Sequence, residues 1–411
     1  MSRSDALLET AKKHLYGNYK PSPFVVERGQ GCELFDVDGK RCLDLAAGVA
    51  VSSVGHAHPA LVRAIVEQAG KVLHTSNYYY NEPNIHLAAE LCARTGYARA
   101  FFCNSGAEAN EALLKAARHH FYARGDKGRQ RIVAFQNAFH GRTMGALSMT
   151  GTPKYREGFG EMGPVTHVPY GDLAAVEAAM GPDVAAIIVE PVQGEGGVYV
   201  APAGFIAGLR KLCDASGALL LVDEVQAGVG RLGRFLGHDG CGARADAIAL
   251  AKGLAGGVPI GAMLTTEALA FALPPGTHGS TFGGNPLACS AALGVLRILD
   301  DERLVDGARE KGEALHAMLS RLVADLPGVC VEARGEGLLR GLVLQPGLVA
   351  RDILPRILQL GVMLTAAGER VLRFSPPLVV TVAQLEEGVA VVRKVLGEIA
   401  AKATAGAPAT A

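Results

Sequence analysis

The sequence has no excess of charge of either sign and no long apolar run. Its 40 lysine and arginine residues balance 40 aspartate and glutamate residues, so no net field favours nucleic acid or an anionic membrane as a partner. No run of about eighteen apolar residues is present to span a bilayer, and residues 1–19 lack the apolar core of a secretory signal. We therefore expect a soluble, unprocessed protein without a nucleic-acid or membrane partner.

The cysteines also lack the spacing of a metal site. All eight lie far apart in the chain, and no C-x-x-C pair occurs among them. Most have apolar neighbours, which is typical of small buried thiols. We expect free thiols in a reducing cytoplasm and no metal site.

A nucleotide-binding P-loop is missing as well. The segment around Lys71 is the nearest match to G-x-x-x-x-G-K-[ST], but it has neither the spaced glycine nor the hydroxyl. A G-x-G-x-x-G pattern does occur at Gly228, Gly230 and Gly233. The residues after it, "RFLGHDGCGARAD", cannot continue as the helix that a dinucleotide-binding fingerprint requires. We interpret this pattern as a glycine-rich loop, and a nucleotide-dependent enzyme stays as a remote alternative.

The composition that is present predicts a folded α/β enzyme. Of 411 residues, 49% are apolar and 52 are glycine, which favours a sizeable core with many loops. Short apolar runs that alternate with helical segments predict a mainly parallel sheet covered on both faces. We predict an N-terminal subdomain of short antiparallel strands (1–54), a large domain (55–285), a smaller α+β domain (286–401) and a flexible tail (402–411).

An anion site is one interpretation of the segment "FFCNSGAEANEALLKAARHHFY". Ser105 and Glu108 match a capping box after an apolar strand, so a helix begins at Gly106. The first turn of a helix offers free backbone N–H groups and the positive end of the helix dipole. Gly106 and Ala107 carry no bulky side chain there, which suits a phosphate. An ordinary capped helix explains the same residues, and both interpretations stay open at this point.

Two further candidates follow apolar strands. Asp223 and Glu224 end "ALLLVDE", and a carboxylate in that place can bind a metal, assist proton transfer or hold a cationic ring nitrogen. Lys252 lies 29 residues after Asp223, about one crossover later. An amine at an apolar strand edge loses hydration, so its neutral form can attack a carbonyl. The alternative is a lysine that extends to solvent.

Three more segments carry polar residues after strands: "FHGRT", "EPVQGEGG" and "HGSTFGGNP". Arg142 in the first suits bidentate recognition of a carboxylate. As a lone arginine it also fits a surface ion pair. We assign no special role to the two histidines, His140 and His278.

Together these segments resemble the class III (subgroup II) aminotransferases of fold type I, which use pyridoxal 5′-phosphate (PLP). The resemblance covers essentially the whole chain, and it implies a seven-stranded, mainly parallel sheet and a small α+β domain built from the two chain ends. It is carried by eight segments in the expected order: "SNYYYNEP", "NSGAEANEALLKAAR", "FHGRT", "EPVQGEGGV", "LLLVDEVQAGVGRLG", "AKGLAGGVPIGAM", "HGSTFGGNPLA" and "LRFSPPLVV".

The resemblance also implies roles for individual residues. Lys252 would hold PLP as a Schiff base and move the proton, while Asp223 would pair with the ring nitrogen. A homodimer with shared active sites would supply Thr281 and Ser280 from the second subunit. The implied cofactor-binding residues are Ser105, Gly106, Ala107, Phe139, Glu190, Asp223, Glu224, Val225, Gln226, Lys252 and Thr281; the implied substrate-binding residues are Arg142, Glu195, Ser280 and Arg373.

The motifs are most similar to those of family members that act on N-acetylornithine. They imply transfer of its δ-amino group to 2-oxoglutarate in arginine biosynthesis. Enzymes for succinylornithine, ornithine, 4-aminobutyrate and N-succinyl-diaminopimelate share much of the set, so these substrates stay as alternatives. A PLP-dependent aminomutase, which needs no separate amino acceptor, is a further alternative.

Overall fold

A seven-stranded sheet lies at the centre of the computed structural model, which describes residues 2–405. Its strand order is β4-β12-β11-β10-β7-β5-β6, and every neighbouring pair is parallel except the two that involve β12. This confirms the predicted mainly parallel sheet. The strands are β4 (Arg99–Cys103), β5 (Arg131–Phe135), β6 (Val165–Val168), β7 (Val184–Val189), β10 (Leu219–Asp223), β11 (Ala247–Leu250) and β12 (Gly261–Thr265).

The apolar runs explain why the sheet is covered on both faces. Every residue of β7, β10, β11 and β12 is buried, as continuous apolar strands of a parallel sheet must be. The chain between β11 and β12 comprises only residues 251–260. A parallel crossover needs a dozen or more residues, so β12 runs antiparallel to its neighbours.

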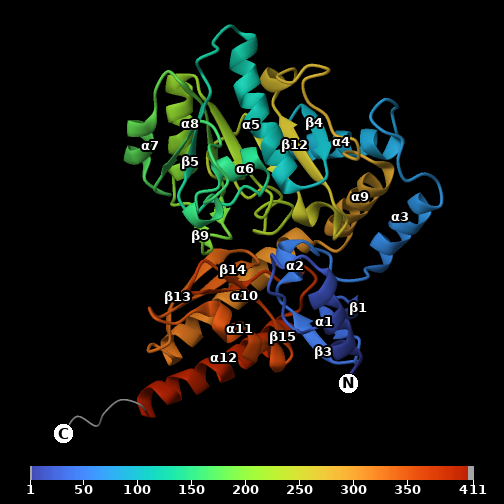
Figure 1. Cartoon of the computed structure of the whole chain (residues 1–411), viewed down its shortest axis with the longest axis vertical. Helices are drawn as coiled ribbons and strands as arrows, with labels where there is room; N and C mark the ends of the chain where they lie inside the picture. Colours follow the sequence, from blue (N-terminus) through green and yellow to red (C-terminus); the bar gives the residue numbers. More distant parts are fainter. Residues whose placement is uncertain (1, 406–411) are drawn as a thin grey trace.

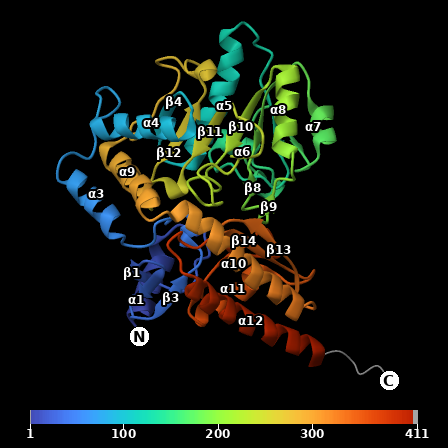
Figure 2. The same ribbon diagram turned by 180° about the vertical axis from the view of Figure 1, so that it is seen from behind.

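Helices pack on the two faces of this sheet (Figures 1 and 2). One face packs against α5, with Ile188 and Leu221 among the strand residues there. The next residues along the same strands, Val189 and Val222, face the opposite core, to which α4, α8 and α9 contribute. The helices of this region are α3 (Pro59–Ala69), α4 (Glu82–Thr95), α5 (Gly106–Ala123), α6 (Met144–Met149), α7 (Leu173–Ala179), α8 (Phe205–Ser216) and α9 (Pro286–Asp301), with the short turns η1 (Pro153–Tyr155), η2 (Lys252–Ala255) and η3 (Glu267–Leu269) and the hairpin β8 (Val192–Gln193) and β9 (Tyr199–Val200).

Helix α9 lies with the large sheet and not with the C-terminal elements. It packs against α3, α4 and η2, and its small residues Ala288, Cys289 and Ala292 are buried there. The sequence boundary at 285–286 therefore falls before a helix that belongs to the large unit. We place the boundary at the end of α9 instead.

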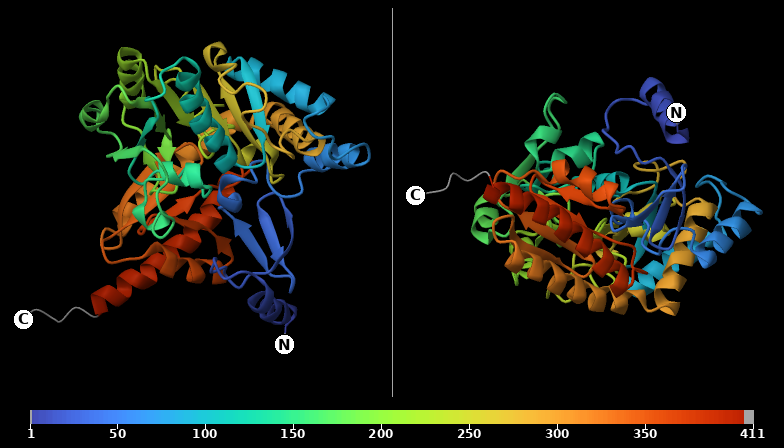
Figure 3. Two further views of the ribbon diagram at one scale, coloured as in Figure 1. Left: turned by 45° about the horizontal axis from the view of Figure 1, so that its top comes forward. Right: turned by 90° about the horizontal axis from the view of Figure 1, so that it is seen from below.

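The two ends of the chain form the smaller unit, as predicted (Figure 3). Strand β15 near the C-terminus pairs with β3 near the N-terminus, so one sheet, β1-β2-β3-β15, joins both ends. A second sheet has the order β13-β14-β17-β16. The elements are α1 (Arg3–His14), β1 (Val26–Gln30), β2 (Glu33–Asp36), β3 (Arg41–Asp44), α2 (Ala47–Ala50), α10 (Leu304–Asp325), β13 (Cys330–Glu336), β14 (Leu339–Leu344), α11 (Ala350–Gln359), β15 (Val362–Met363), β16 (Thr365–Ala367), β17 (Val371–Phe374) and α12 (Val382–Ala405).

The first four residues of the predicted tail, 402–405, are helical. Helix α12 continues to Ala405, and residues 406–411 lie outside the described residues. Within residues 2–405, none of the helices combines the length and the apolar character needed to cross a membrane.

Candidate active site

A cavity of about 410 Å³ lies at the carboxyl ends of the central strands. This is the edge at which open parallel sheets bind ligands. The residues that follow β4, β5, β7, β10 and β11 contribute to its wall. Of the residues implicated by the sequence, those in the wall are Ser105, Gly106, Ala107, Phe139, Arg142, Glu190, Glu195, Asp223, Val225, Gln226 and Lys252.

The N-terminus of α5 points free backbone donors at this cavity. The Ser105 hydroxyl accepts a hydrogen bond from the Glu108 N–H at 3.2 Å, as the capping box predicts. The Glu108 carboxylate, however, accepts from the Asn104 N–H at 2.5 Å and not from Ser105. Within residues 2–405, no hydrogen bond occupies the N–H groups of Ser105, Gly106 and Ala107. These three donors fit a phosphate.

The Asp223 carboxylate is held from two sides. One oxygen, Oδ2, lies 2.7 Å from Asn110 Nδ2 and 2.7 Å from His140 Nδ1, and the other accepts from the Val225 N–H at 2.9 Å. Asn110 and His140 are nearly fully buried, so this network fixes the carboxylate at the cavity wall. Sequence reasoning missed Asn110 and gave His140 no role, which the structure corrects. Asn110 could have been found from the sequence, because it is a polar residue on the otherwise apolar face of the predicted helix.

Lys252 follows β11 in a strained conformation. Its φ is +41°, which is the left-handed region that side chains other than glycine rarely adopt and that often marks a functional site. The next residue is held by Ser53, whose hydroxyl donates to the Gly253 carbonyl at 2.9 Å. Desolvation lowers the pKa of Lys252, and the nearby Glu195 only partly offsets this. A larger share of neutral, nucleophilic amine follows.

Glu190 lies in the same cavity wall. Burial, together with the charge of Asp223, raises its pKa well above the ordinary value. One of its oxygens accepts from the Phe139 N–H at 3.2 Å. The cavity therefore carries the hydrogen-bonded Asp223 carboxylate and, beside it, a second carboxyl group whose pKa is raised.

Arg373 contacts the cavity wall from the smaller unit, through Glu195 and Gln226. It lies on β17 and is only 2% exposed, and its Nη1 is 2.5 Å from Glu195 Oε1. Gln226 Nε2 donates to the same oxygen at 3.2 Å, and Arg373 Nε donates to Thr365 at 3.0 Å. Burial by itself raises the pKa of Glu195, but Arg373 and Lys252 outweigh that effect and bring it below the ordinary value.

Arg142 is exposed at the mouth of the cavity and forms no salt bridge with another described residue. Its guanidinium carbon lies 3.9 Å from the ring centre of Tyr155 and 5.3 Å from that of Phe139. These cation–π contacts hold the side chain without neutralising its charge. Tyr155 was not a candidate from the sequence, because a contact between residues of two loops leaves no local pattern.

Besides Arg373, three predicted residues lie outside the cavity wall. The buried Glu224 carboxylate points away from the cavity and accepts from the N–H groups of Gly237 and His238, at 2.6 and 2.9 Å. Ser280 and Thr281 line a second cavity of about 770 Å³. The Ser280 hydroxyl accepts from Asn104 Nδ2 of its own chain at 3.2 Å. One chain alone therefore does not bring the side chains of these three residues into the main cavity.

Comparisons with known proteins agree with this site. A family model, Aminotransferase class-III, matches residues 16–396. The acetylornithine aminotransferase of Myxococcus xanthus is 49% identical over 387 residues, 94% of this chain and 96% of that protein. The succinylornithine transaminase of Salmonella enteritidis is 46% identical over 90% of this chain and 91% of its own length.

Solved structures agree as well. The ornithine aminotransferase of Toxoplasma gondii superposes with a TM-score of 0.94 at 33% identity, covering 98% of this chain and 97% of that one. A second structure of that enzyme has PLP at partial occupancy in its active site. The family model matches nearly the whole chain, and the cavity contains both backbone donors that fit a phosphate and a lysine that can form an imine. This chain therefore belongs to the class-III aminotransferases, which use pyridoxal phosphate as cofactor.

Proposed function

We propose that this enzyme transfers the δ-amino group of N2-acetyl-L-ornithine to 2-oxoglutarate, which gives N-acetyl-L-glutamate 5-semialdehyde and L-glutamate, in arginine biosynthesis. One observation carries the proposal: a single cavity is lined by Lys252, Asp223, residues 105–107 and Glu195, and Glu195 forms an ion pair with the buried Arg373. The relative that is 49% identical, from Myxococcus xanthus, supports the acylated ornithine as amino donor.

The residues of the cavity fit PLP at both ends. The unpaired N–H groups at the start of α5 would bind its phosphate, and Asp223 would keep the ring nitrogen protonated. When bound, PLP supplies an aldehyde that combines with amines and a ring that withdraws electrons from the substrate. Phe139, Val225 and Gln226 line the space between and hold the ring in place.

Lys252 has two tasks in this proposal. With its pKa depressed, the neutral Nζ amine would be able to form the covalent link to PLP. Once released from that link by a substrate amine, the same Nζ would be the base that takes up and returns the proton of the substrate carbon that bears the amine. Asn110 and His140 serve this step indirectly, because they keep the Asp223 carboxylate in position.

The two substrates alternate in one cavity, and the charged residues suit that requirement. Arg142, which is unpaired, binds the carboxylate of the amino donor. Arg373 is neutralised by Glu195 while that donor is bound. When the five-carbon dicarboxylate 2-oxoglutarate arrives, its second carboxylate replaces Glu195 on Arg373. An unpaired buried arginine would cost several kcal/mol, so a movable carboxylate partner is needed.

A second copy of the chain completes the site in this proposal. Thr281, which binds the phosphate, and Ser280 belong to the partner's active site. Support comes from an exposed aromatic patch beside them, formed by Tyr78, Tyr79, Tyr80 and Phe282, since contiguous exposed apolar surface marks interfaces. All eight cysteines are free thiols, which supports a place in the reducing cytoplasm.

The choice of amino donor is tested in half-reactions without an acceptor. We expect N-acetylornithine to discharge the visible absorption of the bound cofactor at least about tenfold faster, per unit concentration, than ornithine or 4-aminobutyrate. The second candidate is N-succinylornithine, which the Salmonella enteritidis relative favours. A fastest reaction with 4-aminobutyrate would contradict the proposed donor.

The proposed exchange of partners on Arg373 is tested with Glu195→Gln. The change leaves Arg373 without a counter-charge whenever no dicarboxylate is bound, which includes the complex with the amino donor, so we expect kcat/KM for N-acetylornithine to fall about tenfold or more. The KM for 2-oxoglutarate stays the same or decreases, because no carboxylate competes for the arginine. Steady-state kinetics with each substrate varied separately measures both. An equal loss for the two substrates would argue against the exchange.

The shared site is tested by coexpression of two inactive variants. Lys252→Ala lowers turnover about 10²- to 10⁴-fold, and Thr281→Glu places a negative charge against the phosphate. In mixed dimers, one of the two sites contains neither change, so purified mixed dimers should have roughly half of the wild-type activity, and an unpurified, randomly paired mixture roughly a quarter. The activity of purified mixed dimers measures this. Mixed dimers as inactive as either parent would mean that Thr281 serves its own chain's site.

A further inference from the structure

The glycine-rich loop found in the sequence has no part in the proposed chemistry. This segment, residues 228–238, here the glycine loop, runs from the cavity edge between α10 and the hairpin of β13 and β14. A Cβ added at Gly233 would lie 2.7 Å from the Cβ of Arg309 on α10. One added at Gly337 in the hairpin would lie 2.5 Å from the Leu232 carbonyl carbon. Both φ values are positive as well, so only glycine permits this close packing.

Arg231 ties the glycine loop to the strand that carries Arg373. Its carbonyl accepts from the Leu338 N–H at 3.0 Å, and its Nη1 donates to the carbonyls of Leu338 and Pro376, at 3.2 and 2.5 Å. Pro376 follows Arg373 by three residues. Arg231 is 2% exposed, and burial lowers its pKa to about 10, so it stays charged at neutral pH.

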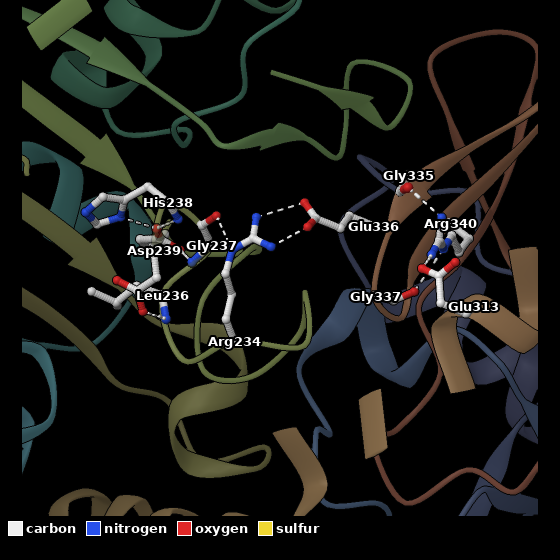
Figure 4. Close-up of polar contacts among 11 residues, drawn as sticks. Arg234, Leu236, Gly237, His238, Asp239, Glu313, Gly335, Glu336, Gly337 and Arg340 are labelled. Atoms are coloured by element: carbon white, nitrogen blue, oxygen red, sulfur yellow. Dashed lines mark hydrogen bonds and ion pairs between the residues drawn. The ribbon is translucent and has the colours of Figure 1, made fainter. Parts of the chain in front are cut away.

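Arg234 makes the second link, which Figure 4 shows between the loop and the hairpin. Both Nη atoms contact the Glu336 carboxylate at the end of β13, with Nη2 and Oε2 at 2.8 Å. The Nε of Arg234 donates to the Gly237 carbonyl at 2.8 Å. The Gly237 N–H in turn donates to Glu224, the neighbour of Asp223 in sequence. A continuous chain of charge-assisted hydrogen bonds thus joins Glu224, which follows the cavity residue Asp223, to Glu336 of the small unit.

The hairpin of β13 and β14 connects the glycine loop to Arg373, because β14 pairs with β17. Arg340 braces the turn, because its Nε and Nη1 donate to the carbonyls of Gly337 and Gly335, at 3.0 and 2.6 Å, and its Nη2 contacts Glu313 at 2.8 Å (Figure 4). The next residue, Gly341, pairs with Arg373 across β14 and β17. A shift of the hairpin relative to the loop therefore moves Arg373 relative to the cavity.

We propose that the glycine loop and the hairpin form a joint that sets the position of Arg373 relative to Lys252 and Asp223, with Arg234 and Glu336 as positioning residues for the dicarboxylate substrate. The proposal rests on the proposed function, in which Arg373 binds a carboxylate of 2-oxoglutarate. It also gives Glu224 a task outside the cavity, which is to anchor the loop beside Asp223.

The joint affects the two half-reactions differently. Binding of a carboxylate by Arg373 depends on its placement, and a misplacement of about 1 Å can weaken such a contact strongly. The reaction of the amino donor takes place at Lys252, with Arg373 neutralised by Glu195 of the large unit. Loosening the joint therefore weakens binding of a dicarboxylate and leaves the amine chemistry nearly unchanged.

The test uses the holoenzyme, two single variants and glutarate, a five-carbon dicarboxylate that binds without turnover. Arg234→Met and Glu336→Gln each break the ion pair and keep the size of the side chain. We expect the Kd of glutarate, measured by titration calorimetry, to rise about tenfold in both. The KM for 2-oxoglutarate rises in parallel, and the rate of the N-acetylornithine half-reaction stays within about twofold.

Two further variants separate positioning from general destabilisation. The reversed pair, Arg234→Glu with Glu336→Arg, restores an ion pair across the joint and recovers most of the glutarate affinity. Arg356→Met removes a surface pair with Glu398, at 3.3 Å between α11 and α12, and leaves glutarate binding as in the wild type.

Each unfavourable outcome has a distinct meaning. Unchanged glutarate binding in both single variants, or an equal loss in the N-acetylornithine half-reaction, would overturn the joint. A wild-type enzyme that reacts with N-acetylornithine but does not bind glutarate would contradict the role of Arg373. A wild-type enzyme that does not react with N-acetylornithine would contradict the proposed donor alone, because glutarate binding still reports on the joint.

Discussion

Removal of water from charged groups at one edge of the large sheet is the constraint on which the whole site depends. A buried charge needs a partner, and most charges here have one: Asn110 and His140 hold Asp223, and Glu195 holds Arg373. Lys252 is the exception, since its amine has no hydrogen bond or ion pair with another residue in 2–405. The surroundings lower its pKa and keep part of it neutral. We therefore propose this buried amine, which has no partner among the described residues, as the nucleophile of the reaction.

The same constraint explains why two structural units have to meet at this edge. The parallel sheet supplies the groups that we propose for the cofactor, whereas Arg373, which we propose for the dicarboxylate, lies on β17 of the small unit. The distance between the two sets is not fixed by either sheet alone. Glycines with positive φ and the buried Arg231 fix it at the glycine loop. The G-x-G-x-x-G pattern, which resembles a nucleotide-binding motif, is therefore explained by close packing of backbone against backbone at this joint.

Local sequence signals were sufficient for much of this structure. Continuous apolar runs predicted the buried strands, and a capping residue followed by small residues predicted the first turn of α5. Both features depend on residues that are neighbours in the chain, so the sequence shows them directly. Contacts between distant segments left no such signal: His140 meets Asp223, and Tyr155 meets Arg142, only after folding. Helix α9 was assigned to the wrong side of a boundary for the same reason, since amphipathicity shows that a helix packs but not against what.

The central claim is that nitrogen moves from one substrate to another at Lys252. N-acetylornithine labelled with ¹⁵N at the δ-position, incubated with the enzyme and 2-oxoglutarate, tests this directly by mass spectrometry of the products. The account predicts that the label appears in glutamate, with one glutamate formed for each N-acetylglutamate 5-semialdehyde. Label that appears as ammonia, or that remains in a rearranged amino acid without any need for 2-oxoglutarate, would contradict it.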